Sequence, residues 1–229
     1  MTTSFYSEAE LATLGLKSYG SKVLISRFTR IYAPEQITIG DNVRIDDFCI
    51  LSGNITIGSN IHIAAYCALY GGECGIVLHN YAGLSARCTI YSTIDDFSGE
   101  YLIGPMVDSN LRKLESGKVV LESYTQVGAN SVVFPSVILR EGTAIGAMSL
   151  VKTSTEPWTI YAGSPAKKTK NRSCNLLKLS KLQTGGGKKH SLNYLFSAKN
   201  SAYTYTLKQQ QDICSDFPLL PRSERRKIA

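Results

Sequence analysis

The sequence lacks the features that mark membrane-inserted and secreted proteins. No apolar run in its 229 residues approaches the roughly 18 residues that cross a bilayer as a helix. The first fifteen residues contain no basic segment followed by an apolar one, so no secretory signal is visible. We therefore expect a cytoplasmic protein without stable membrane insertion. The chain length predicts one well-buried domain with an appendage.

The usual patterns of metal-binding and disulfide-bonded cysteines are missing too. The six cysteines lie at positions 49, 67, 74, 88, 174 and 214, and none of them forms a C-x-x-C pair or a cluster with histidine. Because no secretory signal is visible, these cysteines are expected to be reduced thiols. The sequence thus predicts neither a metal site nor a disulfide framework.

The positive charge does not point to nucleic acid, because it is confined to one end of the chain. Residues 1–174 hold 15 basic and 15 acidic residues, whereas residues 175–229 hold 10 basic and 3 acidic ones, which is the whole net charge of +7. A run of this kind is more often a solvated extension than a binding surface. We expect no nucleic-acid partner and a basic, partly disordered C-terminal extension over 173–229.

What the sequence does contain is an aliphatic residue at every sixth position, with two breaks in the register. All fifteen positions hold Ile, Leu or Val: Ile39, Ile45, Leu51, Ile57, Ile63, Leu69, Leu78, Leu84, Ile90, Leu121, Val127, Val133, Leu139, Ile145 and Val151. A helix would need a period near 3.6 and a single strand a period of two. A period of six fits a short strand and a tight turn, repeated three times in a coil of roughly eighteen residues. The sequence predicts an all-β fold, a parallel β-helix over 23–172.

The remaining segments are explained by the same repeat. Ser7 and Glu10 form a capping-box pattern, which predicts a short helix in the N-terminal lead-in 1–22. Residues 95–117 interrupt the period without building a second core, so they are expected to form a long excursion loop of functional importance. Cys49, Cys67 and Cys88 each follow an inward aliphatic residue by four positions, and we expect them to stack inside the helix as small apolar side chains.

Beyond the repeat, residues 175–183 are compatible with a short amphipathic helix. The triplet Gly185 to Gly187 is interpreted as a linker.

Three stretches of the chain resemble a known family. They are ITIGDNVRIDDFCILSG at 37–53, VGANSVVFPSVILREGTAIGAMSLV at 127–151 and IYAGSPAKKTKNR at 160–172. These stretches resemble the hexapeptide-repeat acyltransferases, in the branch that acylates sugars for surface polysaccharides and lipopolysaccharide. The resemblance implies a left-handed β-helix, acetyl-CoA as the acyl donor, a homotrimer, and active sites in the clefts between neighbouring subunits.

The resemblance also implies roles for particular residues. Ala129 and Ala147 match positions whose backbone groups line the pantetheine arm of coenzyme A. Lys152, Lys167 and Lys170 match residues that reach its phosphate-bearing end, where an ammonium is a suitable point charge. Trp158 lies between two family stretches and is interpreted either as a contact to coenzyme A or as a cover over the end of the helix.

The chain departs from the sugar O-acetyltransferases of this family at one position. Those enzymes place a histidine where the chain leaves the helix for its long loop, whereas counting the hexads puts Asp95 there. A hydroxyl must lose its proton as it attacks, and His is the natural base for that step. A neutral amine attacks with its own lone pair and needs only to be oriented. Asp95 therefore favours an amino-sugar acceptor, as in the acyltransferases of nucleotide-linked 4-amino-4,6-dideoxyhexoses that the chain resembles.

Two further residues are candidates for the site. Ser85 follows the inward Leu84 and is expected to place a hydroxyl near the thioester, although a turn-stabilising serine is an alternative. Glu73 is expected to meet the acceptor, with a plain surface charge as its alternative. For Asp95, capping of loop amides is the structural alternative.

We expect N-acylation of a nucleotide-linked amino sugar with acetyl-CoA. A sugar O-acetyltransferase and a non-catalytic β-helix scaffold are the alternatives.

Overall fold

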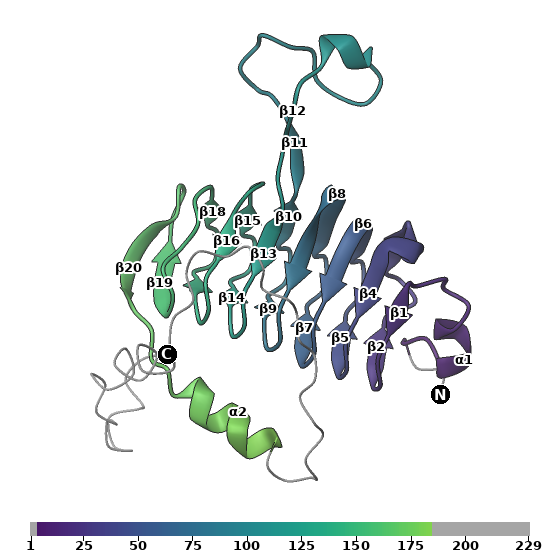
Figure 1. Cartoon of the computed structure of the whole chain (residues 1–229), viewed down its shortest axis with the longest axis vertical. Coiled ribbons are helices and arrows are strands. Elements are labelled where there is room, and N and C mark those ends of the chain that lie inside the picture. The colour runs from purple at the N-terminus through teal and green to yellow at the C-terminus, as the bar shows by residue number, and fades with distance from the viewer. Residues whose placement is uncertain (1–3, 185–229) are drawn as a thin grey trace, which may run out of the picture. The chain divides into compact units, whose positions relative to one another are not determined.

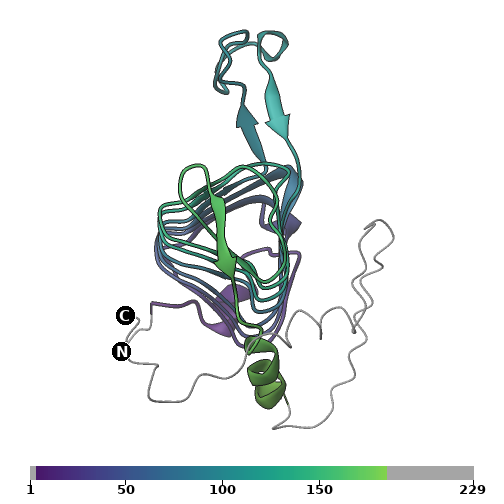
Figure 2. The same ribbon diagram turned by 90° about the vertical axis from the view of Figure 1, so that its left-hand side faces the viewer.

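The computed structural model describes residues 4–184. The chain divides into two units, 1–172 and 173–229. The first unit is a left-handed parallel β-helix with a triangular cross-section (Figures 1 and 2). Its strands are short and its hydrogen bonds run between successive coils, so each coil pairs only with its neighbours. The predicted fold class is confirmed.

One face of the prism is an eight-stranded sheet. In spatial order its strands are β2 (Val23–Ile25), β5 (Val43–Ile45), β7 (Ile61–Ile63), β9 (Gly83–Leu84), β14 (Gln126–Val127), β17 (Ala144–Ile145), β19 (Thr159–Ala162) and the antiparallel β20 (Lys167–Asn171). Its register aligns Ile25, Ile45, Ile63, Leu84, Val127 and Ile145 in one column.

The other two faces form one ten-stranded sheet, because β6 and β8 each turn a corner of the prism. This sheet contains β1 (Ser18–Tyr19), β3 (Arg30–Tyr32), β4 (Ile37–Ile39), β6 (Ile50–Ile57), β8 (Ala68–Leu78), β10 (Thr89–Tyr91), β13 (Val119–Leu121), β15 (Val132–Val133), β16 (Ile138–Leu139) and β18 (Leu150–Val151). Five hexad residues point inward from each of the three faces. All fifteen are at most 3% exposed, so the six-residue period is a packing period, as predicted.

The thiols of the three predicted internal cysteines form a column within this core. Cys49, Cys67 and Cys88 are fully buried and unpaired. Each thiol donates a hydrogen bond to a carbonyl of the next coil, which satisfies that carbonyl inside the prism. The cysteines thus pack as the sequence predicted and also hold the turns of adjacent coils together.

The predicted excursion has more structure than a loop. β11 (Thr93–Asp95) and β12 (Leu114–Ser116) pair as an antiparallel hairpin that rises from the prism and carries the short helix η2 (Ser109–Leu111) above it (Figure 1). Two more short helices belong to the N-terminal half: α1 (Glu8–Leu11) begins at the predicted capping box, and η1 (Pro34–Gln36) bulges from a turn.

In the second unit, α2 (Leu176–Thr184) matches the expected short helix. The predicted glycine linker, like the rest of the extension, lies outside the described residues. Within 4–184 no helix is long and apolar enough to cross a membrane.

Candidate active site

Ser85 lies on a column of small residues that runs along one edge of the prism. The backbone N–H groups of Asp46, Ala64, Ser85, Gly128 and Gly146 each donate to a strand-ending carbonyl of the next coil, so these residues hold the same turn position on successive coils. Close stacking requires the small side chains, because a Cβ at Gly128 would lie 2.5 Å from the Ala147 nitrogen. From Ala64 to Gly146 the column therefore presents backbone atoms, the methyl group of Ala64 and one hydroxyl, that of Ser85.

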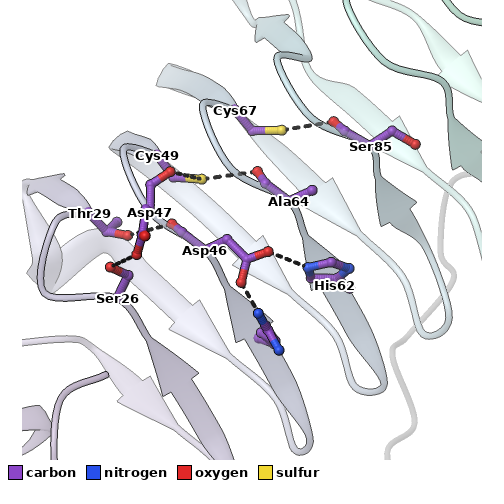
Figure 3. A network of polar contacts seen from close by, with 10 residues as sticks. Ser26, Thr29, Asp46, Asp47, Cys49, His62, Ala64, Cys67 and Ser85 are labelled. Carbon is purple, nitrogen blue, oxygen red and sulfur yellow. Dashed lines mark hydrogen bonds and ion pairs between the residues drawn. The ribbon is translucent and has the colours of Figure 1, made fainter. Parts of the chain in front are cut away.

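Ser85 is held from inside and from outside the prism. The buried thiol of Cys67 donates to the Ser85 carbonyl oxygen at 3.1 Å (Figure 3). On the outer side, Gln126 Nε2 lies 3.5 Å from Ser85 Oγ, at the limit of a hydrogen bond. The half-buried hydroxyl is thus on a fixed turn and open to a ligand.

A hollow of about 390 Å³ lies beside Ser85 on the eight-stranded sheet. It exists because Gly83, the first residue of strand β9, has no side chain, and a Cβ there would lie 2.6 Å from Gln126 Oε1. His62 and Ala64 of the preceding coil and Tyr81 at the corner complete its walls. Its volume is in the range of small-ligand sites, about 300–1,000 Å³.

His62 was not predicted as a site residue. Counting the hexads places it at the end of a hexad, and not at the position where the family's histidine is expected. The register aligns His62 with Gly83, and Ser85 follows two residues later. His62 directly precedes the hexad residue Ile63 and faces outward. Comparing the outward residues at this position from coil to coil could have identified it.

His62 is fixed by a carboxylate on the previous coil. Its Nε2 lies 2.7 Å from Asp46 Oδ2, and Arg44 Nε donates to Asp46 Oδ1 at 2.6 Å. Figure 3 shows the His62 ring beside Asp46, with Ala64 and Ser85 on the following coils. Partial burial opposes ionisation of Asp46, but the hydrogen bonds from His62 and Arg44 outweigh it and hold the pKa of this carboxyl below its ordinary value.

Asp95 lies in β11, at the base of the hairpin, and not beside Ser85. Arg112 Nε donates to its Oδ1 at 2.7 Å, and this hydrogen bond is the main reason why the pKa of Asp95 lies below its ordinary value. Among residues 4–184, no hydrogen bond or ion pair joins Asp95 to Ser85. One chain therefore does not bring the two candidate residues together.

Glu73 is an exposed residue of β8, in the irregular stretch between Gly71 and Gly75. This stretch lies against the root of the hairpin, since a Cβ on Gly72 would be 3.2 Å from Thr93 Oγ1. Glu73 is thus on the Asp95 side of the molecule and does not line the hollow at Ser85.

The residues matched to coenzyme A lie on the coils that follow Ser85. Ala129 and Ala147 come directly after the stacked glycines of the small-residue column. Lys167 and Lys170 are exposed on β20, and Lys152 Nζ lies 5.5 Å from the Phe134 ring centre. An edge of small residues, with exposed lysines on later elements, suits an extended, phosphate-bearing ligand.

Trp158 lies at a corner of the prism, after Tyr81 and Tyr124 in a ladder of rings. It is 3% exposed, its ring packs over Gly142, and it lies 6.1 Å from the Tyr124 ring centre. Both roles expected for Trp158, the contact to coenzyme A and the cover over the end of the helix, stay predictions. Within the described ranges, no group of three His, Cys, Asp or Glu side chains could hold a metal ion.

Comparison with known proteins agrees with this geometry. A family model described as bacterial transferase hexapeptide (six repeats) matches residues 36–71. The dTDP-4-amino-4,6-dideoxy-D-glucose acyltransferase of Escherichia coli is 41% identical over 179 residues, which covers 77% of this chain and 93% of that protein. The chain therefore belongs to the hexapeptide-repeat acyltransferases.

The solved structures of AntD, an N-acyltransferase from Bacillus cereus, are similar as well. One of them, a complex with dTDP-4-amino-4,6-dideoxyglucose and coenzyme A, is 48% identical with a TM-score of 0.80, and the match covers 81% of this chain and 99% of that one. Another contains dTDP and 3-hydroxybutyryl-CoA. The AntD structures include variants of a serine and of an aspartate ten positions apart, which is the spacing of Ser85 and Asp95 here.

Proposed function

We propose that this acyltransferase moves an acyl group, acetyl or a short homologue, from a coenzyme A thioester to the amino group of a nucleotide-linked amino sugar. The observation that carries the proposal is the match to the E. coli acyltransferase over 93% of its length, with an aspartate at the base of the hairpin. The AntD complexes support the same pair of substrates.

The chemistry of Asp95 is consistent with an amine acceptor. Arg112 lowers the pKa of Asp95, so the carboxylate is ionised at neutral pH and is a weak base. It can still accept a hydrogen bond from the substrate amine and so direct the nitrogen lone pair at the thioester carbon. The C–N bond then forms, the C–S bond breaks, the thiolate of coenzyme A leaves, and the nitrogen gives its extra proton to solvent.

Other residues would bind the two substrates. Ser85 would donate a hydrogen bond to the carbonyl oxygen of the thioester, where negative charge develops. The backbone at Ala129 and Ala147 would line the pantetheine arm, and Lys152, Lys167 and Lys170 would approach the phosphates. Glu73, on the hairpin side of the prism, would contact the acceptor together with Asp95.

A homotrimer would complete this site, because Ser85 and Asp95 are not in contact within one chain. An exposed aromatic ladder supports association: Phe28, Phe48 and Tyr66 stack along a corner of the prism, with 56%, 49% and 51% of their surface exposed. We place the enzyme in the cytoplasm, where coenzyme A thioesters and nucleotide sugars are made. The acylated sugar would serve surface polysaccharide or O-antigen synthesis.

One observation favours a second candidate, a sugar O-acetyltransferase. His62, held by Asp46, lines the same hollow as Ser85, and a histidine oriented by a carboxylate is a common general base.

A panel of acceptors separates the two functions. The full-length protein is incubated with acetyl-CoA and either nucleotide-linked amino sugars, with dTDP-4-amino-4,6-dideoxyglucose first, or the matching hydroxy sugars. We expect acyl product, detected by mass, with an amino sugar alone. Product with hydroxy sugars in preference would establish the second candidate. Coenzyme A release without any acylated sugar would contradict both.

A further inference from the structure

The small-residue column gives the site a direction along the prism axis. Ala129 and Ala147, which we assign to the pantetheine arm, lie on the coils that follow Ser85. A thioester that ends at Ser85 therefore occupies the C-terminal side of this serine. The side of Ser85 that faces the preceding coils is therefore available to the acceptor, whose amine attacks the thioester.

The hollow opens toward that side, and Gln126 of the following coil bounds it on the other. It extends from Ser85 to Ala64 and His62 on the previous coil, and Gly83 keeps its floor open. At Ala64 the column carries only a methyl group, so nothing large separates the hollow from the hydroxyl of Ser85. Its lining includes the polar residues His62, Gln126 and Asn60, and a few polar groups in a hollow are typical of a ligand site.

Hydrogen bonds orient the His62 ring and leave one of its nitrogens for a ligand. Both oxygens of Asp46 are engaged, one by Arg44 and one by His62. Because Asp46 is ionised, it accepts a hydrogen bond from Nε2–H. In the tautomer that this contact selects, Nδ1 is the acceptor. A sugar hydroxyl is a matching donor. The carboxylate thus fixes both the ring orientation and the tautomer of His62.

We infer that this hollow is the subsite for the sugar ring of the acceptor, with His62 Nδ1 accepting a hydrogen bond from a sugar hydroxyl and Asp46 positioning the imidazole. The inference rests on the proposed function and adds to it where the acceptor lies and which side chain recognises it. His62 is a binding residue in this account, because the amine needs no base to attack.

Kinetics of three variants with dTDP-4-amino-4,6-dideoxyglucose and acetyl-CoA test the inference. His62→Ala should raise KM for the sugar by about tenfold, the effect of one lost hydrogen bond to a ligand, with kcat and KM for acetyl-CoA within about twofold of wild type. His62→Asn, which keeps a polar atom near the place of Nδ1, should recover part of this loss. Ala64→Leu fills the hollow and should raise KM for the sugar by more than tenfold.

Leu24→Ala is the matched control, since Leu24 occupies the same strand position as His62 two coils earlier and is exposed outside the hollow. It should change neither KM, and thermal unfolding should be cooperative for all the variants.

Three outcomes would overturn the inference while leaving the proposed function intact. These are an unchanged KM for the sugar in both His62→Ala and Ala64→Leu, a rise in KM for acetyl-CoA instead, or a hundredfold fall in kcat of His62→Ala at unchanged KM, which would identify His62 as a base. A wild-type protein that acylates no amino sugar would contradict the proposed function, and the inference would fall with it.

Discussion

At the scale of single residues, the interior of the prism is connected to the chemistry on its surface through Cys67. Cys49 and Cys67 occupy equivalent places in consecutive coils, both fully buried, and donate to Ala64 O at 3.2 Å and to Ser85 O at 3.1 Å. The contact with Cys49 lowers the pKa of the Cys67 thiol, but its contact with Cys88 and its burial raise that pKa to about 12. Cys67 is thus a protonated donor, and Ser85 is the residue whose carbonyl it holds.

Alanine variants of the two cysteines therefore separate an effect on protein stability from an effect on the position of Ser85. Cys67→Ala and Cys49→Ala should each lower the free energy of unfolding by about 1–2 kcal/mol, through a small cavity and a lost hydrogen bond. Only Cys67→Ala should also lower kcat, by about tenfold, because the turn that carries Ser85 loses its inner anchor. Cys67→Ser, which keeps a donor, should recover part of kcat. Equal kcat values for the two alanine variants would refute a positioning role for Cys67.

The residue scale also marks the limit of what the sequence predicts. The buried aliphatic and cysteine columns were predictable, because a period of six repeats wherever the inside of a coil must be filled. His62 was not, since its role depends on Gly83 one coil later and on Asp46 one coil earlier, and a single linear pattern does not express contacts across three coils. The ion pair of Asp95 with Arg112 depends in the same way on the pairing of β11 with β12.

At the scale of elements, the rings of Tyr81, Tyr124 and Trp158 form a ladder along one corner of the prism. Trp158 can reach this ladder because Gly142 leaves room for its ring. Gly142 has a φ of +67°, and a Cβ added there would lie 2.4 Å from the indole. The substitution would therefore strain the backbone and displace the ring together.

Gly142→Ala should lower the free energy of unfolding by about 2–4 kcal/mol, seen as a fall in Tm with a shift in tryptophan fluorescence as the ring becomes solvated. Gly99→Ala is the control. Gly99, in the excursion, also has a positive φ of +91°, but a Cβ there meets nothing within 4 Å. It should cost only the backbone strain, about 1 kcal/mol, with no change in fluorescence. Similar losses in both variants would mean that the ring contact contributes little.

At the scale of the whole molecule, the separation of Ser85 from Asp95 makes the proposed trimer testable. The hairpin that bears Asp95 rises from the prism (Figure 1), while Ser85 directly follows β9, a central strand of the eight-stranded sheet. In a threefold ring each site would combine Ser85 of one subunit with Asp95 of the next. Two inactive variants with lesions on opposite sides of the site should then complement each other.

Asp95→Asn and Ser85→Ala should each reduce transfer strongly, Asp95→Asn by roughly 10²–10⁴-fold as expected for one orienting group. The two variants are denatured together in equal amounts and refolded, so that subunits mix at random. Each site then has about one chance in four of receiving intact Ser85 and intact Asp95, and activity should return to about a quarter of wild type. Light scattering of the same sample should give the mass of a trimer. If both residues came from one subunit, no mixture would exceed the average of its parents, since every subunit carries one lesion.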